Sequence, residues 1–186
     1  FWLDSRLNEF SGKMRGTVMD LGGKRENKRG TFKPPEHQAR AWWYLNLDLS
    51  TSPNIFADVT RTPLKTGSVD CIICTEVLEH VPDPHVLMAE MARVLKPGGT
   101  LLVTVPFMQP LHELPSDYYR FTPSSMHRFA ENAGLQVESI QPRGNFATAM
   151  GSMLSQWLIR SVGARERQSD GSVILSRWRS ILLLPI

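Results

Sequence analysis

Apolar residues in this chain fall into short continuous runs, separated by segments whose apolar positions repeat at helical spacing. Residues 69–74 and 101–105 are apolar at nearly every position, and residues 17–21 form a further short apolar strand. Continuous runs of this kind are typical of strands buried on both faces, as in a parallel sheet covered by helices. Further short strands are predicted at residues 43–48, 55–58 and 135–140.

Helices are predicted between these strands. Asp83 can cap one helix and Pro84 suits its first turn. Its apolar positions form a single stripe, made of Leu87, Met88, Met91, Val94 and Leu95. Thr122 and Pro123 open another helix, and Gly134 is placed to end it. The alternation predicts an α/β fold with a doubly wound, mostly parallel sheet and helices on both faces.

The remaining helical patterns lie at the two ends of the chain. Residues 2–14 carry apolar positions at helical spacing, and so does a segment that begins at residue 146. We therefore expect one α/β domain over residues 1–145 and a C-terminal helical extension over residues 146–186. The chain ends abruptly in an apolar hexapeptide, so we expect that the extension is truncated.

The composition favours a globular domain and does not favour a nucleic-acid-binding protein. A chain of 186 residues with 41% hydrophobic and 21% charged residues can bury a core as one globular domain. The net charge of +3 is concentrated in residues 24–40 and 160–179. A nucleic-acid-binding protein usually carries a more continuous basic face, so no nucleic-acid partner is expected.

Two cysteines, Cys71 and Cys74, lie within an apolar run, which favours a reducing, cytoplasmic location over a disulfide framework. Their spacing is compatible with metal ligation, but they belong to opposite faces of a predicted strand and no second pair follows. Core packing is the better interpretation, and no metal site is predicted.

The C-terminal segment allows two interpretations. Arginines in residues 160–179 precede the apolar residues 181–186. Basic and apolar groups together predict peripheral attachment to an anionic membrane. The alternative is a helix that packs on the domain. No stretch approaches the roughly 18 apolar residues of a membrane span.

Polar residues and glycines follow the predicted strands, at the edge where ligands bind in open parallel sheets. Gly22 and Gly23 allow close approach of the backbone to a ligand, or form an ordinary tight turn. Asp48 can accept hydrogen bonds from two ribose hydroxyls, or is a surface carboxylate. Asp58 can accept one from an adenine amino group, or stabilises a turn before Thr60.

The order of these features resembles the type 11 class I S-adenosylmethionine-dependent methyltransferases, from about residue 17 to residue 140. The motifs that carry the resemblance are VMDLG at 18–22, LDLS at 47–50, ADV to SVD at 57–70, EVLEHV at 76–81 and RVLKPGG at 93–99. The resemblance implies a Rossmann-like domain that uses S-adenosyl-L-methionine as its cofactor. The implied cofactor-binding residues are Asp20, Gly22, Gly23, Asp48, Asp58 and Thr75.

One departure from the family pattern concerns the glycine loop. The usual motif is D-x-G-x-G, but Lys24 stands at the second glycine and a basic stretch follows over residues 25–30. Pro34 and Pro35 interrupt the next expected helix. Either the basic residues contact the cofactor carboxylate or an anionic substrate, or they form a solvated loop.

The loop over residues 106–122 leaves the fifth strand at the ligand-binding edge, and polar loops of this length are often functional. Its pattern H-x-x-P-x-D-Y-Y-R-F-T resembles a subset of type 11 proteins associated with glycan or cell-envelope synthesis. His112 is our first choice as general base and Asp117 the second. Tyr118, Tyr119 and Arg120 are candidate substrate contacts. Alternatively, Asp117 and Arg120 pair to brace the loop.

These residues predict methyl transfer to a small-molecule, glycan or cell-envelope acceptor. Such a reaction is a direct displacement at the sulfonium methyl, in which the protein aligns the reactants and excludes water. A nicotinamide oxidoreductase would carry G-x-G-x-x-G and, in short-chain types, Tyr-x-x-x-Lys, which Tyr118 and Tyr119 do not complete. A catalytically degenerate binding protein is the alternative that Lys24 raises.

His80 follows a predicted strand and allows two interpretations. The resemblance places it near the cofactor, and the alternative is a structural role in which it caps the loop.

Overall fold

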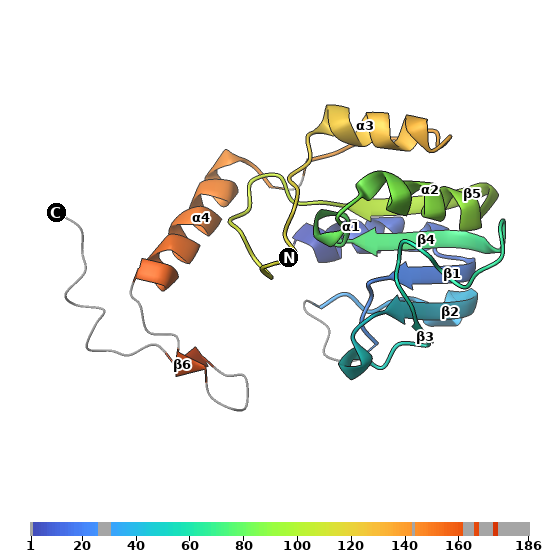
Figure 1. Cartoon of the computed structure of the whole chain (residues 1–186), viewed down its shortest axis with the longest axis horizontal. Coiled ribbons are helices and arrows are strands. Elements are labelled where there is room, and N and C mark those ends of the chain that lie inside the picture. Colours follow the sequence, from blue (N-terminus) through green and yellow to red (C-terminus); the bar gives the residue numbers. More distant parts are fainter. Residues whose placement is uncertain (1, 26–30, 143, 162–165, 168–172, 175–186) are drawn as a thin grey trace. The chain divides into compact units, whose positions relative to one another are not determined.

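A five-stranded parallel sheet forms the centre of the computed structural model, which describes residues 2–25, 31–142, 144–161, 166–167 and 173–174 (Figure 1). The strand order is β3-β2-β1-β4-β5, and each neighbouring pair is parallel. The strands are β1 (Gly16–Leu21), β2 (Ala39–Asn46), β3 (Ile55–Phe56), β4 (Val69–Thr75) and β5 (Leu95–Thr104). This arrangement confirms the predicted doubly wound sheet.

The sheet changes winding direction between β1 and β4. The chain passes outward from β1 through β2 to β3, then returns to place β4 on the other side of β1. In open α/β sheets, the carboxyl ends of the two strands at such a switch point flank a crevice in which ligands bind. A ligand site is therefore expected at the carboxyl ends of β1 and β4.

Helices cover both faces of the sheet (Figure 1). Helix α1 (Trp2–Phe10) packs Leu7 against Val18, Cys71 and Ile73. Helices α2 (Pro84–Val94) and α3 (Pro123–Asn132) pack on the opposite face, because alternate residues of each strand point to opposite sides. The predicted caps are confirmed, since Asp83 accepts a hydrogen bond from His85 N–H and Thr122 one from Ser125 N–H.

The two cysteines are core residues on opposite faces, as their spacing predicted. Cys71 packs with the α1 side and Cys74 with the α2 side, and neither forms a disulfide. Burial raises the pKa of both thiols, that of Cys71 to about 12. They are therefore unreactive packing residues at neutral pH.

Two predicted elements differ from the structure. Residues 135–140 form no strand, although their polarity alternates. Leu135 and Val137 pack against the core, but this segment takes no part in the ladder of the sheet. The second strand runs over Ala39–Asn46, earlier than the predicted 43–48, because Asp48 caps the 3₁₀ helix η3 (Leu49–Thr51) instead.

The described residues of the C-terminal region belong to a second unit. Contacts divide the chain into Phe1–Phe107 with Leu111–Arg143, and Met108–Pro110 with Gly144–Ile186. The second unit holds α4 (Phe146–Ser161) and an antiparallel pair, β6 (Glu166–Arg167) and β7 (Val173–Ile174). The predicted boundary at residue 145 stays a prediction.

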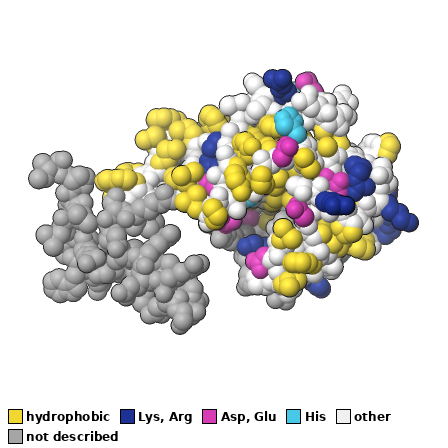
Figure 2. All heavy atoms as spheres, viewed as in Figure 1, with side chains coloured by type: hydrophobic (Ala, Val, Ile, Leu, Met, Phe, Trp, Pro, Cys, Tyr) yellow, Lys and Arg dark blue, Asp and Glu magenta, His cyan; other side chains and the backbone are white. Residues whose placement is uncertain are grey.

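Helix α4 confirms the predicted C-terminal helix and carries exposed hydrophobic side chains (Figure 2). They include Phe146, Met150, Leu154, Trp157 and Leu158. In the described part of the chain, no helix is long and apolar enough to cross a membrane. The apolar tail at 181–186, most of the arginine-rich segment before it and the basic loop at 26–30 lie outside the described residues.

Glu90 of α2 ties this helix to the loop before β4. Its carboxylate accepts two hydrogen bonds from Arg93, each 2.7 Å long, and two from the backbone and hydroxyl of Thr62. The Arg93 guanidinium is the main cause that lowers the pKa of Glu90 to about 2. The stability that Glu90 contributes is therefore present above about pH 4.5 and lost as the pH falls towards 2.

We expect Glu90→Gln to lower the free energy of unfolding by about 1–2 kcal/mol at pH 7, because charge-assisted hydrogen bonds are lost. The difference between variant and wild type should shrink as the pH falls from 5 to 2. Urea denaturation at several pH values measures both effects. Glu131→Gln, on the exposed side of α3, is the control. A difference that is constant over this pH range would contradict the assignment.

Candidate functional site at the switch point

Gly22 lies where β1 ends and has a left-handed backbone with φ of +73°. The Gly22 N–H donates to the Leu45 carbonyl at 2.8 Å, and the side-chain amide of Asn46 donates to the Gly22 carbonyl at 3.0 Å. A Cβ at this position would overlap a methyl group of Val77, which follows β4. Only glycine therefore satisfies both the backbone conformation and the close packing here.

Gly23 continues this turn next to Asp20. The Asn46 amide also donates to the Gly23 carbonyl, at 3.1 Å, and a Cβ on Gly23 would overlap the Asp20 carboxyl group. The turn is thus held by Asn46 and packs tightly between the ends of β1 and β4. Lys24, which stands where the family pattern has its second glycine, follows directly and is half-buried.

Asp48 and Asp58 lie beyond the carboxyl ends of β2 and β3, as predicted. Asp48 Oδ1 accepts hydrogen bonds from the Ser50 N–H and hydroxyl, at 2.9 and 2.6 Å. The Ser50 hydroxyl, followed by its N–H, lowers the pKa of this exposed carboxyl group. Asp58 Oδ1 accepts in the same way from Thr60, at 2.8 Å twice. In each of these two carboxylates, the hydrogen bonds to Oδ1 fix the position of the side chain.

The end of β4 is strained at Glu76, which follows Thr75. Glu76 has a φ of +54°, which is uncommon for a residue with a side chain. Its N–H donates to the Thr104 carbonyl at 3.0 Å, and the Thr104 hydroxyl donates to its carboxylate at 2.9 Å. These bonds to β5 turn the chain sharply and place the 3₁₀ helix η4 (Leu78–His80) directly after the strand.

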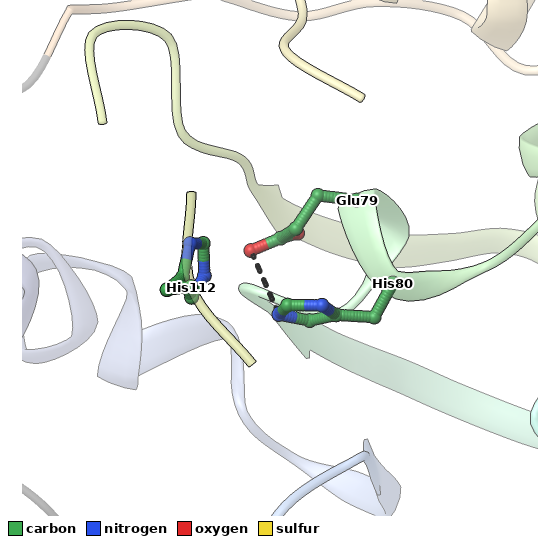
Figure 3. A group of neighbouring side chains, drawn as sticks. All are labelled: Glu79, His80 and His112. Atoms are coloured by element: carbon green, nitrogen blue, oxygen red, sulfur yellow. Dashed lines mark ion pairs between the residues drawn. The ribbon is translucent and has the colours of Figure 1, made fainter. Parts of the chain in front are cut away.

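Glu79 of η4 is a fully buried carboxyl group (Figure 3). Within the described residues, neither of its side-chain oxygens has a hydrogen-bond partner. Burial is the main cause that raises its pKa to about 7. The nearest cation-forming group is His80, whose Nε2 lies 3.7 Å from Glu79 Oε1. An unpartnered buried carboxyl group is costly and is typical of functional positions.

His80 has a defined tautomer. Its Nδ1 lies 2.5 Å from the Ser116 carbonyl oxygen. A carbonyl only accepts hydrogen bonds, so Nδ1 carries the hydrogen. In the neutral ring, Nε2 then holds a lone pair, and this nitrogen faces the carboxylates of Glu79 and Glu113 at 3.7 and 3.8 Å.

The loop after β5 is clamped onto the segment that follows β4. Tyr118 N–H donates to the Glu79 carbonyl at 2.9 Å, and the Tyr119 hydroxyl donates to the Pro82 carbonyl at 2.8 Å. With the contact between His80 and Ser116, these bonds join segments more than 30 positions apart in the sequence. They bring the His112 ring to 5.0 Å from the His80 ring, nearly perpendicular to it (Figure 3).

Asp117 braces this loop from inside. Its buried carboxylate accepts from Arg120 at 2.6 and 2.8 Å and from the His112 N–H at 2.8 Å. The Arg120 guanidinium holds the pKa of Asp117 well below its usual range. Asp117 is therefore a poor proton acceptor, and its predicted role as an alternative base does not fit. The pairing of Asp117 with Arg120, the alternative interpretation, is what the structure contains.

The structure thus brings His112 together with two residues of η4. Glu79, His80 and His112 each offer one ligand-type atom, and these atoms lie within 4.8 Å of one another. Glu79 and Glu76 were not predicted as site residues, although both belong to the EVLEHV motif. Burial of Glu79, which the sequence pattern does not reveal, is the property that distinguishes it. Tyr118 and Tyr119 keep their rings partly exposed.

Comparisons with known proteins identify the domain. A family model described as "Methyltransferase domain" matches residues 41–103. A ubiquinone biosynthesis O-methyltransferase of Cupriavidus pinatubonensis is 38% identical over 95 residues, covering 42% of this chain and 37% of the relative. The same enzyme of Xanthomonas oryzae pv. oryzae is 34% identical over 93 residues, covering 41% and 39%. The matched residues therefore belong to a class I S-adenosylmethionine-dependent methyltransferase domain.

Solved methyltransferase structures share the fold. A putative methyltransferase from Bacillus halodurans matches with a TM-score of 0.64 at 15% identity, over 90% of this chain and 86% of that one. An S-adenosylmethionine-dependent methyltransferase from Mesorhizobium loti matches with a TM-score of 0.60 at 16% identity, over 84% and 92%. The fold is the one that the sequence predicted.

The methyltransferase match covers only part of the site. The chain spans less than two fifths of the length of the curated relatives named above. Residues 41–103 include Asp48, Asp58 and the η4 residues, but not the glycine turn at Gly22 or the loop that carries His112. The glycine turn and the loop that carries His112 therefore lie outside the family match.

Proposed function

We propose that this methyltransferase binds S-adenosyl-L-methionine at the ends of β1 and β4 and methylates a hydroxyl group of a small-molecule acceptor. The supporting observation is the contact of the His112 loop with η4, next to the switch point. An acceptor oxygen forms a bond to the methyl carbon, the carbon–sulfur bond breaks, and its electron pair stays on sulfur. The names of the relatives, which are O-methyltransferases, favour oxygen as the acceptor atom.

The cofactor would be held by the residues after β1, β2 and β3. Gly22 and Gly23 allow backbone contact with its methionine end, and Asp48 accepts from the ribose hydroxyls. Asp58 accepts from the adenine amino group. Asp20 and Thr75, at the ends of β1 and β4, complete the proposed set.

His112 would take the acceptor proton, with its loop fixed by Asp117 and Arg120. Tyr118 and Tyr119 present partly exposed rings and are the proposed acceptor contacts. Arg120 is also a candidate substrate contact, but its two hydrogen bonds to the Asp117 carboxylate make support of the loop its first role. A glycan or cell-envelope acceptor, peripheral membrane contact through the C-terminal tail and a cytoplasmic location stay predictions.

Calorimetric titration with S-adenosylhomocysteine, together with methyl transfer from labelled cofactor to catechol-type and saccharide hydroxyls, tests the proposal. Micromolar binding and transfer to a hydroxyl support it. Binding without transfer to any acceptor would favour the alternative of a catalytically degenerate binding protein, which Lys24 in place of the second glycine motivates. The absence of binding would contradict the proposal.

Asp48→Ala is expected to weaken S-adenosylhomocysteine binding by about tenfold or more, because two ribose hydroxyls lose a charged acceptor. The matched control is Asp83→Ala, which removes a comparable capping carboxylate from the start of α2. Both variants lose a local cap, but only the first should change the dissociation constant. Equal constants for Asp48→Ala and wild type would remove Asp48 from the cofactor site.

A further inference from the structure

We propose that Glu79, His80 and His112 bind a divalent first-row transition-metal ion. One carboxylate and two imidazoles form the set, and their ligand-type atoms lie within 4.8 Å of one another (Figure 3). Tetrahedral ligands at about 2.1 Å from a metal ion lie about 3.4 Å from one another, so the three side chains would move closer together when the ion binds. The ligands come from two segments, η4 and the loop after β5.

The first argument is the buried Glu79 carboxyl group. Its side chain is fully inaccessible, and both oxygens lack hydrogen-bond partners within the described residues. Buried carboxylates in proteins are normally paired with a cation or coordinate a metal. The His80 imidazole, at 3.7 Å, and the Arg120 guanidinium both act on this carboxyl group, but neither donates a hydrogen bond to it. A metal ion would supply the direct partner that Glu79 lacks.

The second argument is the orientation of His80. Its Nδ1 donates to the Ser116 carbonyl, which leaves the Nε2 lone pair directed towards Glu79. Metal-binding histidines commonly donate their other ring N–H to a backbone carbonyl or a carboxylate, which fixes the tautomer that the metal requires. His80 is therefore already in the form that binds a metal.

The third argument is the support of His112. Its Nδ1 lies 3.3 Å from Asp117 Oδ2, and a hydrogen on Nδ1 that faces this carboxylate leaves Nε2 available for a metal. Arg120 Nη2 is farther from Nδ1, at 3.4 Å, and donates at 2.8 Å to Asp117 Oδ2. Arg120 in turn holds the Asp117 carboxylate through two hydrogen bonds. A carboxylate behind a histidine is the second common way in which proteins orient a metal ligand. The pair of Asp117 and Arg120 would therefore orient His112 as a metal ligand, in addition to stabilising the loop.

The donor set selects the metal. Two imidazoles with one carboxylate suit zinc, manganese, iron or cobalt better than magnesium or calcium, which prefer oxygen ligands. Three protein ligands also leave coordination positions for a substrate atom. The sequence pattern predicts no metal site, because the pair with metal-type spacing, Cys71 and Cys74, belongs to the core.

The catalytic consequence rests on the proposed function. A metal ion at this site would bind the acceptor oxygen and lower the pKa of its hydroxyl group, whose proton would leave to water, so that the oxygen attacks the methyl carbon in its ionised form. His112 would then act as a ligand that holds this ion. Binding of the metal itself does not depend on the methyl-transfer reaction.

Metal binding is tested on the full chain after dialysis against a chelator and removal of any affinity tag. Titration with Co²⁺, followed by its visible absorption, and calorimetry with Zn²⁺ should both give one equivalent. Glu79→Gln and His112→Ala should each weaken binding at least tenfold. His85→Ala, which removes a histidine of α2 outside the cluster, is the matched control and should bind as wild type does.

Circular dichroism and thermal melting confirm that each variant is folded. Binding of one equivalent that both substitutions weaken supports the site, even in a protein that transfers no methyl group. Absence of binding to the wild type, or equal affinity in folded Glu79→Gln and His112→Ala variants, overturns it, even if methyl transfer is intact. The failure of this inference and that of the proposed function are thus distinguishable.

Discussion

His112→Ala is expected to lower the turnover number by about 100-fold or more, while the affinity for S-adenosylhomocysteine stays within about twofold of wild type. His112 lies on the loop after β5, against η4, where the proposed function places the acceptor. The variant removes the imidazole that either accepts the acceptor proton itself or holds the metal ion that lowers the pKa of the acceptor hydroxyl group. Steady-state kinetics at saturating cofactor, with calorimetry for the affinity, measures both quantities.

His127→Ala is the control, since His127 is exposed on α3. It should leave both turnover and affinity unchanged. If His112→Ala abolished cofactor binding in a protein that circular dichroism shows to be folded, the loop would belong to the cofactor pocket. The assignment of His112 to the acceptor side would then be wrong.

Gly22→Ala should weaken S-adenosylhomocysteine binding by at least tenfold. The added methyl group meets Val77, and the φ of +73° is unfavourable for any residue with a side chain. The turn must therefore move away from the end of β4, and the Asn46 amide loses its position on the Gly22 carbonyl. Calorimetric titration of the purified variant gives the affinity directly.

Gly134→Ala separates loss of the site from loss of stability. Gly134 has a φ of +74°, almost the same as Gly22, but a Cβ there meets no atom within 4 Å. Both variants carry the same backbone strain, and Gly22→Ala adds the overlap with Val77, so both should lose thermal stability, Gly22→Ala at least as much. Only Gly22→Ala should bind the cofactor more weakly. Similar affinities in the two variants would show that the glycine turn does not contact the cofactor.

Much of the fold could be predicted because its signals are local. A strand buried on both faces needs apolar residues at consecutive positions, and Val69–Thr75 supplies them. Asp83 and Thr122 mark helix starts because their side chains bond to backbone groups two or three residues later. Such interactions depend on neighbours in the sequence, so the pattern reveals them.

Residues 135–140 mark the limit of this reasoning. Their alternating polarity is typical of a strand, but a strand also needs a partner whose backbone groups accept and donate in register. Leu135 and Val137 bury their side chains against the core without entering the ladder. Alternation records which side chains are buried, and it does not determine how the backbone is paired.

The residues of the candidate site also fall into two groups, those that the sequence pattern predicts and those that only the tertiary structure reveals. The sequence by itself determined the glycine turn and the acidic residues after β2 and β3, because each position follows from the end of a strand. Only the tertiary structure decided that Glu79 is buried without a partner and that His112 lies beside it. Those two residues meet because backbone hydrogen bonds, such as that from Tyr118 to the Glu79 carbonyl, hold the loop on η4. Backbone groups are the same at every residue, so no pattern of side chains predicts where such bonds will form.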